Sequence, residues 1–332
     1  MLTTRFTELV GCSAPIQAAP VATEPELAAA VSEAGGLGML PMGQAGLTPE
    51  TLAGLLRALQ QQTHRPVGVN FIISPRFEAN RAFWLSRIEQ AAQAVRVVEF
   101  FWAVPDRELV ALAHRSGALV AWQVGSGDAA VAAAEAGCDF IVAQGIEAGG
   151  HVRGRLGLLP LLAEVVPRVA LPVVAAGGIA TGRAVAAALA AGAEGVRVGT
   201  RFLVAAEAST HPTYVDHLLQ AHGEDTEYTE VFGVGWPDAP HRVLRSCIAA
   251  AAAFPNDIVG EGLSLEGQRY PWRRYQTGIA SRSTTGAIEA MPLWAGEGVG
   301  AVTQVQPAAT ILAELVTVAE HCLRRASSLL GP

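Results

Sequence analysis

The sequence predicts an α/β protein, a (β/α)8 TIM barrel with a mostly helical insertion near the C-terminal end. One local pattern returns four times: an alanine-rich amphipathic stretch, a glycine and a short β-branched run. The glycines are Gly35, Gly117, Gly137 and Gly192. Glycine after a helix adopts the left-handed conformation that ends it, and the apolar run that follows suits a strand covered on both faces. The repeated unit is therefore a helix followed by a parallel strand.

Eight candidate strands precede residue 200, with helical patterns between most of them. They are PIQAA (15–19), the run after Gly35, PVGVNFI (66–72), VRVVEFF (95–101), the runs after Gly117 and Gly137, LPVVAAGG (171–178) and the run after Gly192. Eight β–α units indicate a barrel. An open, doubly wound sheet would alternate in the same way, but glycine clusters at the ends of the last two strands favour the barrel.

The remaining chain divides into an insertion and a closing helix. Residues 211–292 contain Trp236, Tyr270, Trp272 and Tyr275 among polar, proline and glycine breaks. We expect residues 1–210 and 293–332 to form the barrel and residues 211–292 to form a helical lid over its mouth. A packing appendage is the alternative. The closing helix is expected at about 307–329.

Composition excludes several partner classes. The net charge is −7, and the longest basic runs are two pairs of adjacent arginines, so nothing offers the cationic stripe that nucleic acid or an anionic membrane requires. Apolar stretches fall well short of the roughly 20 residues that span a bilayer. The N-terminus lacks a basic start followed by an apolar block. We therefore expect a cytoplasmic protein.

Cysteine and lysine usage narrows the chemistry. Cys12, Cys138, Cys247 and Cys322 are scattered without a C-x-x-C pair, which argues against a zinc ribbon, an iron–sulfur cluster or a disulfide framework. All 23 basic residues are arginine. Without lysine, Schiff-base enzymes and Walker-type phosphate binding are excluded. Any bound phosphate must be held by backbone N–H groups and arginine.

Glycines lie where a TIM barrel commonly binds phosphate, after the seventh and eighth strands. The seventh strand leads into AAGGIATGR, with Gly177 and Gly178, and the eighth into RVGTRF, with Gly199 and Thr200. Glycine allows the backbone to approach an anion without interference from a Cβ atom. Tight turns would explain either cluster alone, but the two together favour a phosphate site.

The sixth strand, DFIVAQ, runs into GIEAGGHVRG and supplies the catalytic candidate. Gln144 ends the strand, Gly149 and Gly150 form a close-approach turn, and His151 follows beside Arg153. A loop histidine is usually only solvated. Because this one should face the phosphate loops, we expect a catalytic role, since imidazole exchanges protons near neutral pH.

Two further polar side chains end predicted strands on the same face. Asn70 ends the third strand and Gln123 the fifth, where an amide could bind a cofactor or merely cap a loop. The histidines at 211, 217 and 222 are irregularly spaced, so no metal site is expected.

The motifs GVNF, VAQGIEAGGH, PVVAAGGIATG and VRVGTRF, in this order, resemble the nitronate monooxygenase family, formerly 2-nitropropane dioxygenases. TRFTEL, PIQAAP and EAGGLGML are similar too, so the resemblance covers about residues 3–210 and returns at LWAGEGVG (293–300). It implies noncovalent FMN without a metal and a catalytic histidine at His151. The contacts it implies are Asn70, Gln144, Gly149, Gly178, Arg197, Val198, Gly199 and Thr200.

Two residues depart from the family pattern, and they affect which of the family's flavin and substrate contacts can be expected in this chain. Val21 stands where many relatives have methionine, and Glu297 stands where they often have glutamine, in the loop that begins at Gly296. We expect both near the flavin or substrate, with Val21 and Gly296 among the cofactor contacts. A carboxylate there would disfavour anionic substrates unless an arginine paired with it.

The resemblance implies that FMN takes electrons from an alkyl nitronate and passes them to dioxygen, giving a carbonyl compound and nitrite. His151 would act as a base toward the nitroalkane or orient the nitronate. The scaffold also resembles FMN-dependent enoyl-thioester and quinone reductases, in which NAD(P)H is the electron donor. A flavin-free phosphosugar enzyme and a noncatalytic FMN-binding protein are weaker alternatives. The sequence does not decide between a monomer and a homodimer.

Overall fold

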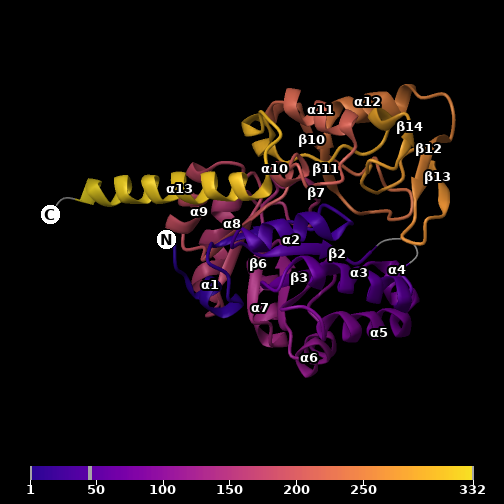
Figure 1. Ribbon diagram of the computed structural model, residues 1–332. Coiled ribbons are helices and arrows are strands. Elements are labelled where there is room, and N and C mark those ends of the chain that lie inside the picture. Colours follow the sequence, from indigo (N-terminus) through magenta and orange to yellow (C-terminus); the bar gives the residue numbers. More distant parts are fainter. Residues whose placement is uncertain (1, 44–46, 331–332) are drawn as a thin grey trace.

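The computed structural model describes residues 2–43 and 47–330, and it confirms the barrel. Eight parallel strands follow the order β1-β9-β8-β6-β5-β4-β3-β2 (Figure 1). Leu37 closes the ring between β1 and β2, because its N–H donates to Ile16 O and its carbonyl accepts from Ala18 N, each at 2.9 Å. The strands are β1 (Ile16–Ala18), β2 (Gly38–Pro41), β3 (Val67–Ile72), β4 (Val97–Phe101), β5 (Leu119–Val124), β6 (Phe140–Gln144), β8 (Val173–Ala176) and β9 (Gly195–Val198).

Helices cover the outside of the barrel. Four of them end one or two residues before the predicted glycines, and all four glycines have positive φ. The outer helices are α2 (Pro25–Glu33), α3 (Pro49–Gln62), α5 (Arg81–Ala92), α6 (Arg107–Arg115), α7 (Gly127–Ala136), α8 (Leu158–Val165), α9 (Gly182–Ala190) and α13 (Ala308–Ser327). Shorter ones are α1 (Arg5–Val10), α4 (Pro75–Ala79), α10 (Thr200–Leu203), and the 3-10 turns η1 (Val166–Arg168), η4 (Glu297–Ala301) and η5 (Ser328–Leu330).

The barrel interior is apolar at one end and polar at the other. Strand side chains alternate between the two faces, so Val97 and Glu99 point inward while Val98 and Phe100 join the outer core. At the amino ends of the strands, α1 inserts Phe6, whose ring meets that of Phe140 edge-on at 5.3 Å. This apolar plug fills one end. The polar layer lies toward the carboxyl ends.

The inserted segment is mixed rather than mostly helical. It contains α11 (Pro212–Gln220), η2 (Gly223–Asp225), β10 (Thr226–Thr229), β11 (His241–Leu244), α12 (Arg245–Ala253), β12 (Ile258–Leu263), β13 (Arg269–Arg273), β14 (Thr285–Gly286) and η3 (Ile288–Ala290). Two three-stranded sheets form, β10-β11-β7 and β13-β12-β14, where β7 (Gly150–His151) comes from the barrel. The β-branched and aromatic content of β11 and β13 and the glycine-containing loop between β12 and β13 favour hairpins.

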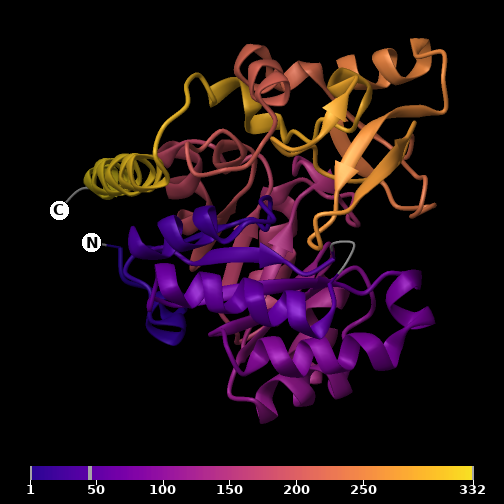
Figure 2. The ribbon, with the colours of Figure 1, turned by 45° about the vertical axis from the view of Figure 1, so that its right-hand side comes forward.

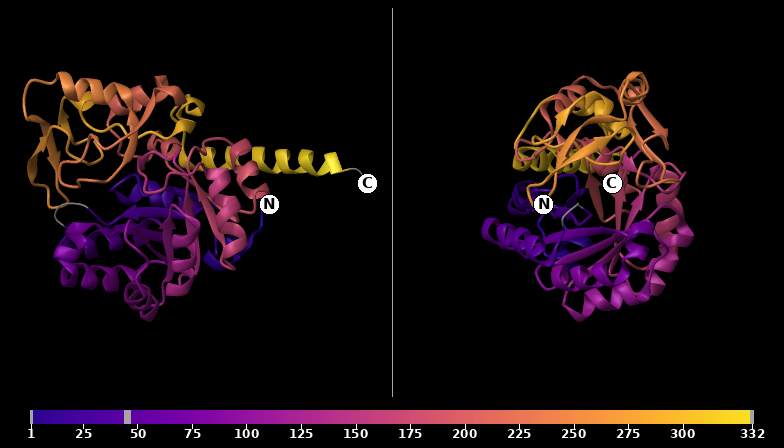
Figure 3. Two further views of the ribbon diagram at one scale, coloured as in Figure 1. Left: turned by 180° about the vertical axis from the view of Figure 1, so that it is seen from behind. Right: turned by 90° about the vertical axis from the view of Figure 1, so that its right-hand side faces the viewer.

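The insertion lies over the carboxyl ends of the strands, and the β12–β13 hairpin points down toward the barrel (Figure 2). A separate apolar cluster stabilises it, including Tyr214, Phe232, Met291 and Leu293. At the hairpin turn, Leu265 packs against the barrel's own core. The C-terminal part of α13 extends away from the body (Figure 3). Among residues 2–43 and 47–330, no helix has both the length and the apolar character needed to cross a membrane.

Candidate active site

A cavity of about 660 Å³ lies between the carboxyl ends of the strands and the insertion. The structure brings nearly all the predicted site residues to its wall. They are Val21, Asn70, Gln123, Gln144, Gly149, Gly150, His151, Gly177, Gly178, Arg197, Gly199, Thr200 and Gly296. These residues are far apart in the sequence, and parallel strands bring them together because their carboxyl ends share one face.

Val198 is the exception among the predicted contacts. It does not line the cavity, and its side chain is fully buried in the outer core between strands and helices. Because side chains alternate along β9, Arg197 points inward and Val198 must point outward. Its backbone carbonyl accepts a hydrogen bond from Ala19 N at 2.8 Å. The side chain of Val198 therefore does not reach the cavity, and its predicted contact with the cofactor stays a prediction.

One end of the cavity is lined by glycine loops with free N–H groups. Gly177 and Gly178 have φ values of 118° and 65°, which side chains rarely adopt. Within the described chain, the N–H groups of Gly177, Gly178 and Thr200 donate to no protein acceptor. Thr200 begins α10, where the first amides of a helix are unpaired. This end suits an anion such as phosphate.

The glycine loops also pack against one another without side chains between them. A Cβ on Gly149 would lie 2.6 Å from Gly296 N, and one on Gly298 would lie 2.4 Å from Gly178 O. Gly296 N donates to Thr200 Oγ1 at 3.0 Å, which joins the late loop to α10. Glycine is therefore required at these positions because the loops pack backbone against backbone. It also leaves the loop N–H groups open to a ligand.

The floor of the cavity is a buried polar network from five strands. Asn70 Nδ2 donates to Glu99 Oε1 at 2.7 Å, and Gln17 Nε2 donates to Glu99 Oε2 at 3.2 Å. Arg197 pairs with the Glu99 carboxylate, donates to Gln123 Oε1, and donates through Nε to Gln17 Oε1 at 3.3 Å. Glu99 and Gln17 are fully buried. Because the two buried charges are paired, neither bears the full desolvation penalty of an isolated buried charge.

Burial lowers the pKa of Arg197 to about 9, since desolvation disfavours the guanidinium charge. It therefore remains a cation at neutral pH. Sequence reasoning missed Glu99 and Gln17, although each is a polar residue at an inward position of an apolar strand. The same signal had identified Asn70 and Gln123.

His151 lies on the opposite wall, in β7. This two-residue strand pairs with β11, which places His151 beside His241 with ring centroids 5.4 Å apart. Trp236, Trp294 and Trp102 surround the imidazole, with ring centroids at 4.0, 5.4 and 5.8 Å from it. His151 Nε2 lies 3.1 Å from Thr277 Oγ1, while Nδ1 is buried without a hydrogen-bond partner in the described structure.

Burial and the neighbouring His241 lower the pKa of His151 to about 3. The imidazole is therefore neutral at physiological pH and can donate or accept a hydrogen bond. Gln144 fixes the strand that carries it, because Gln144 Nε2 donates to His151 O at 3.0 Å. The other amide atom, Gln144 Oε1, is buried and has no partner among the described residues. It is an acceptor without a donor at the cavity wall.

The aromatic residues around His151 were not predicted as site residues. Trp102 directly follows β4 and has a φ of 91°, a strained value for a bulky residue. Its ring packs against Trp236 with centroids 4.7 Å apart. Strained backbone of this kind tends to occur at functional sites. The sequence did offer one signal for this group, because Trp102 directly follows a predicted strand.

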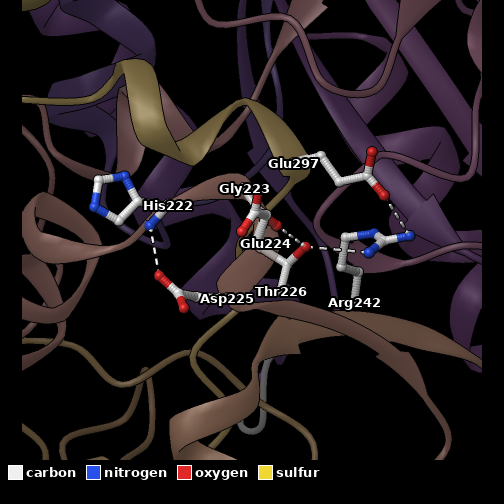
Figure 4. Close-up of a pocket in the computed structure, with 7 residues that line it drawn as sticks. All are labelled: His222, Gly223, Glu224, Asp225, Thr226, Arg242 and Glu297. Carbon is white, nitrogen blue, oxygen red and sulfur yellow. Dashed lines mark hydrogen bonds and ion pairs between the residues drawn. The ribbon is translucent and has the colours of Figure 1, made fainter.

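Glu297 points away from the large cavity, contrary to expectation. Its side chain pairs with Arg242 at 3.0 Å, at a second, more open pocket shown in Figure 4. Arg242 also donates to Ile146 O at 3.0 Å and to Thr226 Oγ1 at 3.1 Å. The arginine partner that the sequence analysis required is thus present. The ion pair with Arg242 holds the Glu297 carboxylate away from the cavity wall. Val21 does line the cavity as expected.

These features fit FMN. Unpaired N–H groups at the glycine end suit a phosphate, and added Cβ atoms there would meet backbone. The amides of the floor and the unpartnered Gln144 Oε1 suit the polar edge of a flavin ring. The large apolar and aromatic side chains of the outer wall suit an organic substrate.

Comparison with known proteins decides the family. The model of the nitronate monooxygenase family matches residues 3–317. The chain belongs to the nitronate monooxygenase family. It is 31% identical to the nitronate monooxygenase of Pseudomonas aeruginosa, over 95% of this chain and 99% of that protein. Membership makes it an oxidoreductase of the flavin-dependent type.

The chain is also similar to two proteins that are not named as nitronate monooxygenases. The chain is 38% identical to (3aS,4S,5R,7aS)-5-hydroxy-7a-methyl-1-oxo-octahydro-1H-indene-4-carboxyl-CoA dehydrogenase of Rhodococcus jostii, over 78% of this chain and 70% of that protein. It resembles the structure of FabK from Thermotoga maritima, with a TM-score of 0.79 and 28% identity, covering 99% of this chain and 100% of that one. The chain is thus similar to proteins of more than one named activity.

Proposed function

We propose that this nitronate monooxygenase family member binds FMN and oxidises alkyl nitronates with dioxygen, giving a carbonyl compound and nitrite. The observation that carries the proposal is the position of His151, a neutral imidazole on the wall of a cavity whose other end is built for a phosphate. FMN, when bound, would supply the electron transfer, and the chain supplies placement and charge.

The chain's residues divide this work. Gly177, Gly178 and Thr200 would hold the phosphate through their unpaired N–H groups. Asn70, Gln123 and Arg197 would bind the polar edge of the ring from the floor. In this arrangement the substrate would bind between the ring and His151.

His151 would act mainly by orienting an anionic nitronate. A neutral imidazole whose pKa lies near 3 is a weak base, but its N–H is a good hydrogen-bond donor to an anion in a dry site. Thr277, bonded to Nε2, sets the ring orientation. If His151 removed a proton from a neutral nitroalkane, it would become a buried imidazolium. The negative charge of the nitronate formed in the same step would be its only counter-charge.

Segment 211–292 would act as the lid that shapes the substrate end of the cavity. Leu263, Leu265, Tyr270 and Trp272 of its β12–β13 hairpin line the cavity, and Leu265 also contacts the barrel core. An aromatic, apolar outer wall excludes water, which strengthens hydrogen bonds within the site.

A second candidate is FMN-dependent reduction of a thioester with NAD(P)H as the electron donor. It is favoured by the 38% identity to a protein named as a carboxyl-CoA dehydrogenase. The apolar outer wall would suit a larger acyl group as well as a nitronate.

An anaerobic stopped-flow experiment separates the two candidates. The purified yellow protein is mixed with propyl nitronate and, separately, with NADH and NADPH, while the flavin absorbance is followed. Bleaching by propyl nitronate at a rate that accounts for turnover supports the first proposal. Bleaching by NAD(P)H alone would replace it with the second. A colourless preparation that takes up no FMN would refute both.

A further inference from the structure

The polar floor of the cavity contains one carboxylate and one guanidinium, and both are buried. Glu99 is fully buried and does not itself line the cavity, whereas its partners Asn70 and Arg197 do. In register, Glu99 lies opposite Asn70 of β3, and Gln17 lies opposite Arg197 of β9. Glu99 can therefore influence a bound ring only through its neighbours.

These charges determine which atoms the two amides turn toward the cavity. A carboxylate only accepts hydrogen bonds, so Asn70 must give it the Nδ2 donor and keep Oδ1 as a free acceptor. A guanidinium only donates, so Gln123 must give it Oε1 and keep Nε2 as a free donor. The hydrogen bonds of these two side chains among the described residues use only Asn70 Nδ2 and Gln123 Oε1, so Asn70 Oδ1 and Gln123 Nε2 stay available to a ligand.

The resulting pattern is one acceptor and one donor at the cavity wall, from the strands on either side of β4. The pyrimidine end of a flavin ring offers the complement, an N–H flanked by carbonyl groups. The same pair also keeps the floor electrically neutral. Without the carboxylate, the Arg197 cation would be unbalanced in a low-dielectric environment, where its influence on a nearby charge is large.

We propose that Glu99 is a positioning residue that acts through Asn70 and Arg197. It fixes Asn70 as an acceptor and Gln123 as a donor, and it neutralises the cation beneath the flavin ring. The inference rests on the proposed binding of FMN. Reduction adds negative charge to the ring, so an unbalanced cation favours the reduced form, and an unbalanced carboxylate favours the oxidised form.

Three variants test the proposal in the FMN-loaded protein. Glu99→Gln keeps the side-chain shape but removes the charge, and we expect a positive shift of the flavin midpoint potential. A tenfold change in the two-electron equilibrium corresponds to about 30 mV, which is the expected size. Arg197→Gln should shift the potential in the opposite direction. The double variant should return toward the wild-type value, because both charges are gone.

The dissociation constant of FMN gives a second readout. Glutamine at position 99 can donate or accept, so Asn70 loses its fixed orientation, and we expect FMN to bind about tenfold more weakly. Glu194→Gln is the matched control, because it removes the carboxylate of a surface pair with Arg5, outside the cavity. It should change neither the potential nor the affinity.

The outcomes are distinguishable. An unchanged potential and affinity in Glu99→Gln, or shifts of the same sign in the two single variants, would overturn the inference. If Glu99→Gln does not fold, Arg197→Gln and the double variant still decide, because only charge compensation predicts that the second substitution reverses the effect of the first. A wild-type protein that takes up no FMN would refute the proposed function instead.

Discussion

The floor of the cavity and its outer wall are held in different ways. The floor is carried by barrel strands, and its side chains are fixed by a hydrogen-bonded network around Glu99 and Arg197. The wall comes from a two-residue strand, loops and the insertion, and it is held by ring packing around His151. Rigid strands suit the binding of a cofactor in one orientation. A wall of loops suits substrate selection, which varies among relatives.

If the floor binds the cofactor and the wall selects the substrate, a substitution in the wall should have the largest effect on activity. His151→Ala should retain flavin, because the floor and glycine loops are untouched, but it should lose about 10–10²-fold of its activity on an alkyl nitronate, the size of a lost hydrogen bond to an anion. The absorbance spectrum and the rate of nitrite release check this. A variant that loses its flavin would show that the wall also binds the cofactor, and one with full turnover would exclude His151 from the chemistry.

The stability of the wall should depend on pH. The pKa of His151 is lowered to about 3, so in the folded state it stays neutral where the unfolded state binds a proton. Stability therefore falls as pH drops below about 6.5 and continues to fall toward pH 3. Between pH 7 and pH 5, His151 accounts for a loss of about 2 kcal/mol.

Urea unfolding of FMN-free protein at both pH values measures this loss. His151→Asn should show a smaller loss than the wild type. His211 and His241, whose pKa values burial also lowers, leave a residual slope in the variant. Equal pH dependence in the two proteins would mean that His151 is not desolvated.

Two glycines with the same backbone requirement separate the phosphate end from the scaffold. Gly177 and Gly117 both have positive φ, but only Gly177 lines the cavity. Each change to alanine should destabilise the fold by about 1 kcal/mol through its backbone conformation, and Gly177→Ala by somewhat more, because its Cβ would lie 3.1 Å from Gly145 O whereas that of Gly117 would meet nothing within 4 Å. Only Gly177→Ala should weaken FMN binding, by about tenfold, as measured by fluorescence titration. Equal FMN affinity in both variants would place the phosphate elsewhere.

The smallest effect is expected outside both regions. Glu297→Gln removes the carboxylate that pairs with Arg242, and Glu297 is 43% exposed. Arg242 is buried but keeps its hydrogen bonds to Ile146 O and Thr226 Oγ1, so the free energy of unfolding should fall by about 1 kcal/mol or less, and the FMN dissociation constant should change by less than about threefold. Chemical denaturation and titration check this. A large loss of FMN would show that the ion pair holds the adjacent glycine loop in place.

Sequence reasoning predicted the floor better than the wall. Strand periodicity and helix-ending glycines gave all eight barrel strands, and an amide at a strand end located Asn70 and Gln123. The same logic applied to Glu99 in VRVVEFF would have completed the network. The wall could not be assembled in this way, because Trp102, Trp236 and Trp294 meet only through tertiary packing. The hairpins of the insertion were missed because their aromatic content was interpreted as helical packing.

The apolar plug formed by α1 has a kinetic consequence. Because Phe6 and its neighbours fill the amino end of the barrel, reactants enter from the carboxyl end, beneath the insertion. The electron donor and the electron acceptor must then use the same opening in turn. We therefore expect the two reactants to compete for this opening, seen as inhibition of turnover by excess nitronate that a higher dioxygen concentration relieves.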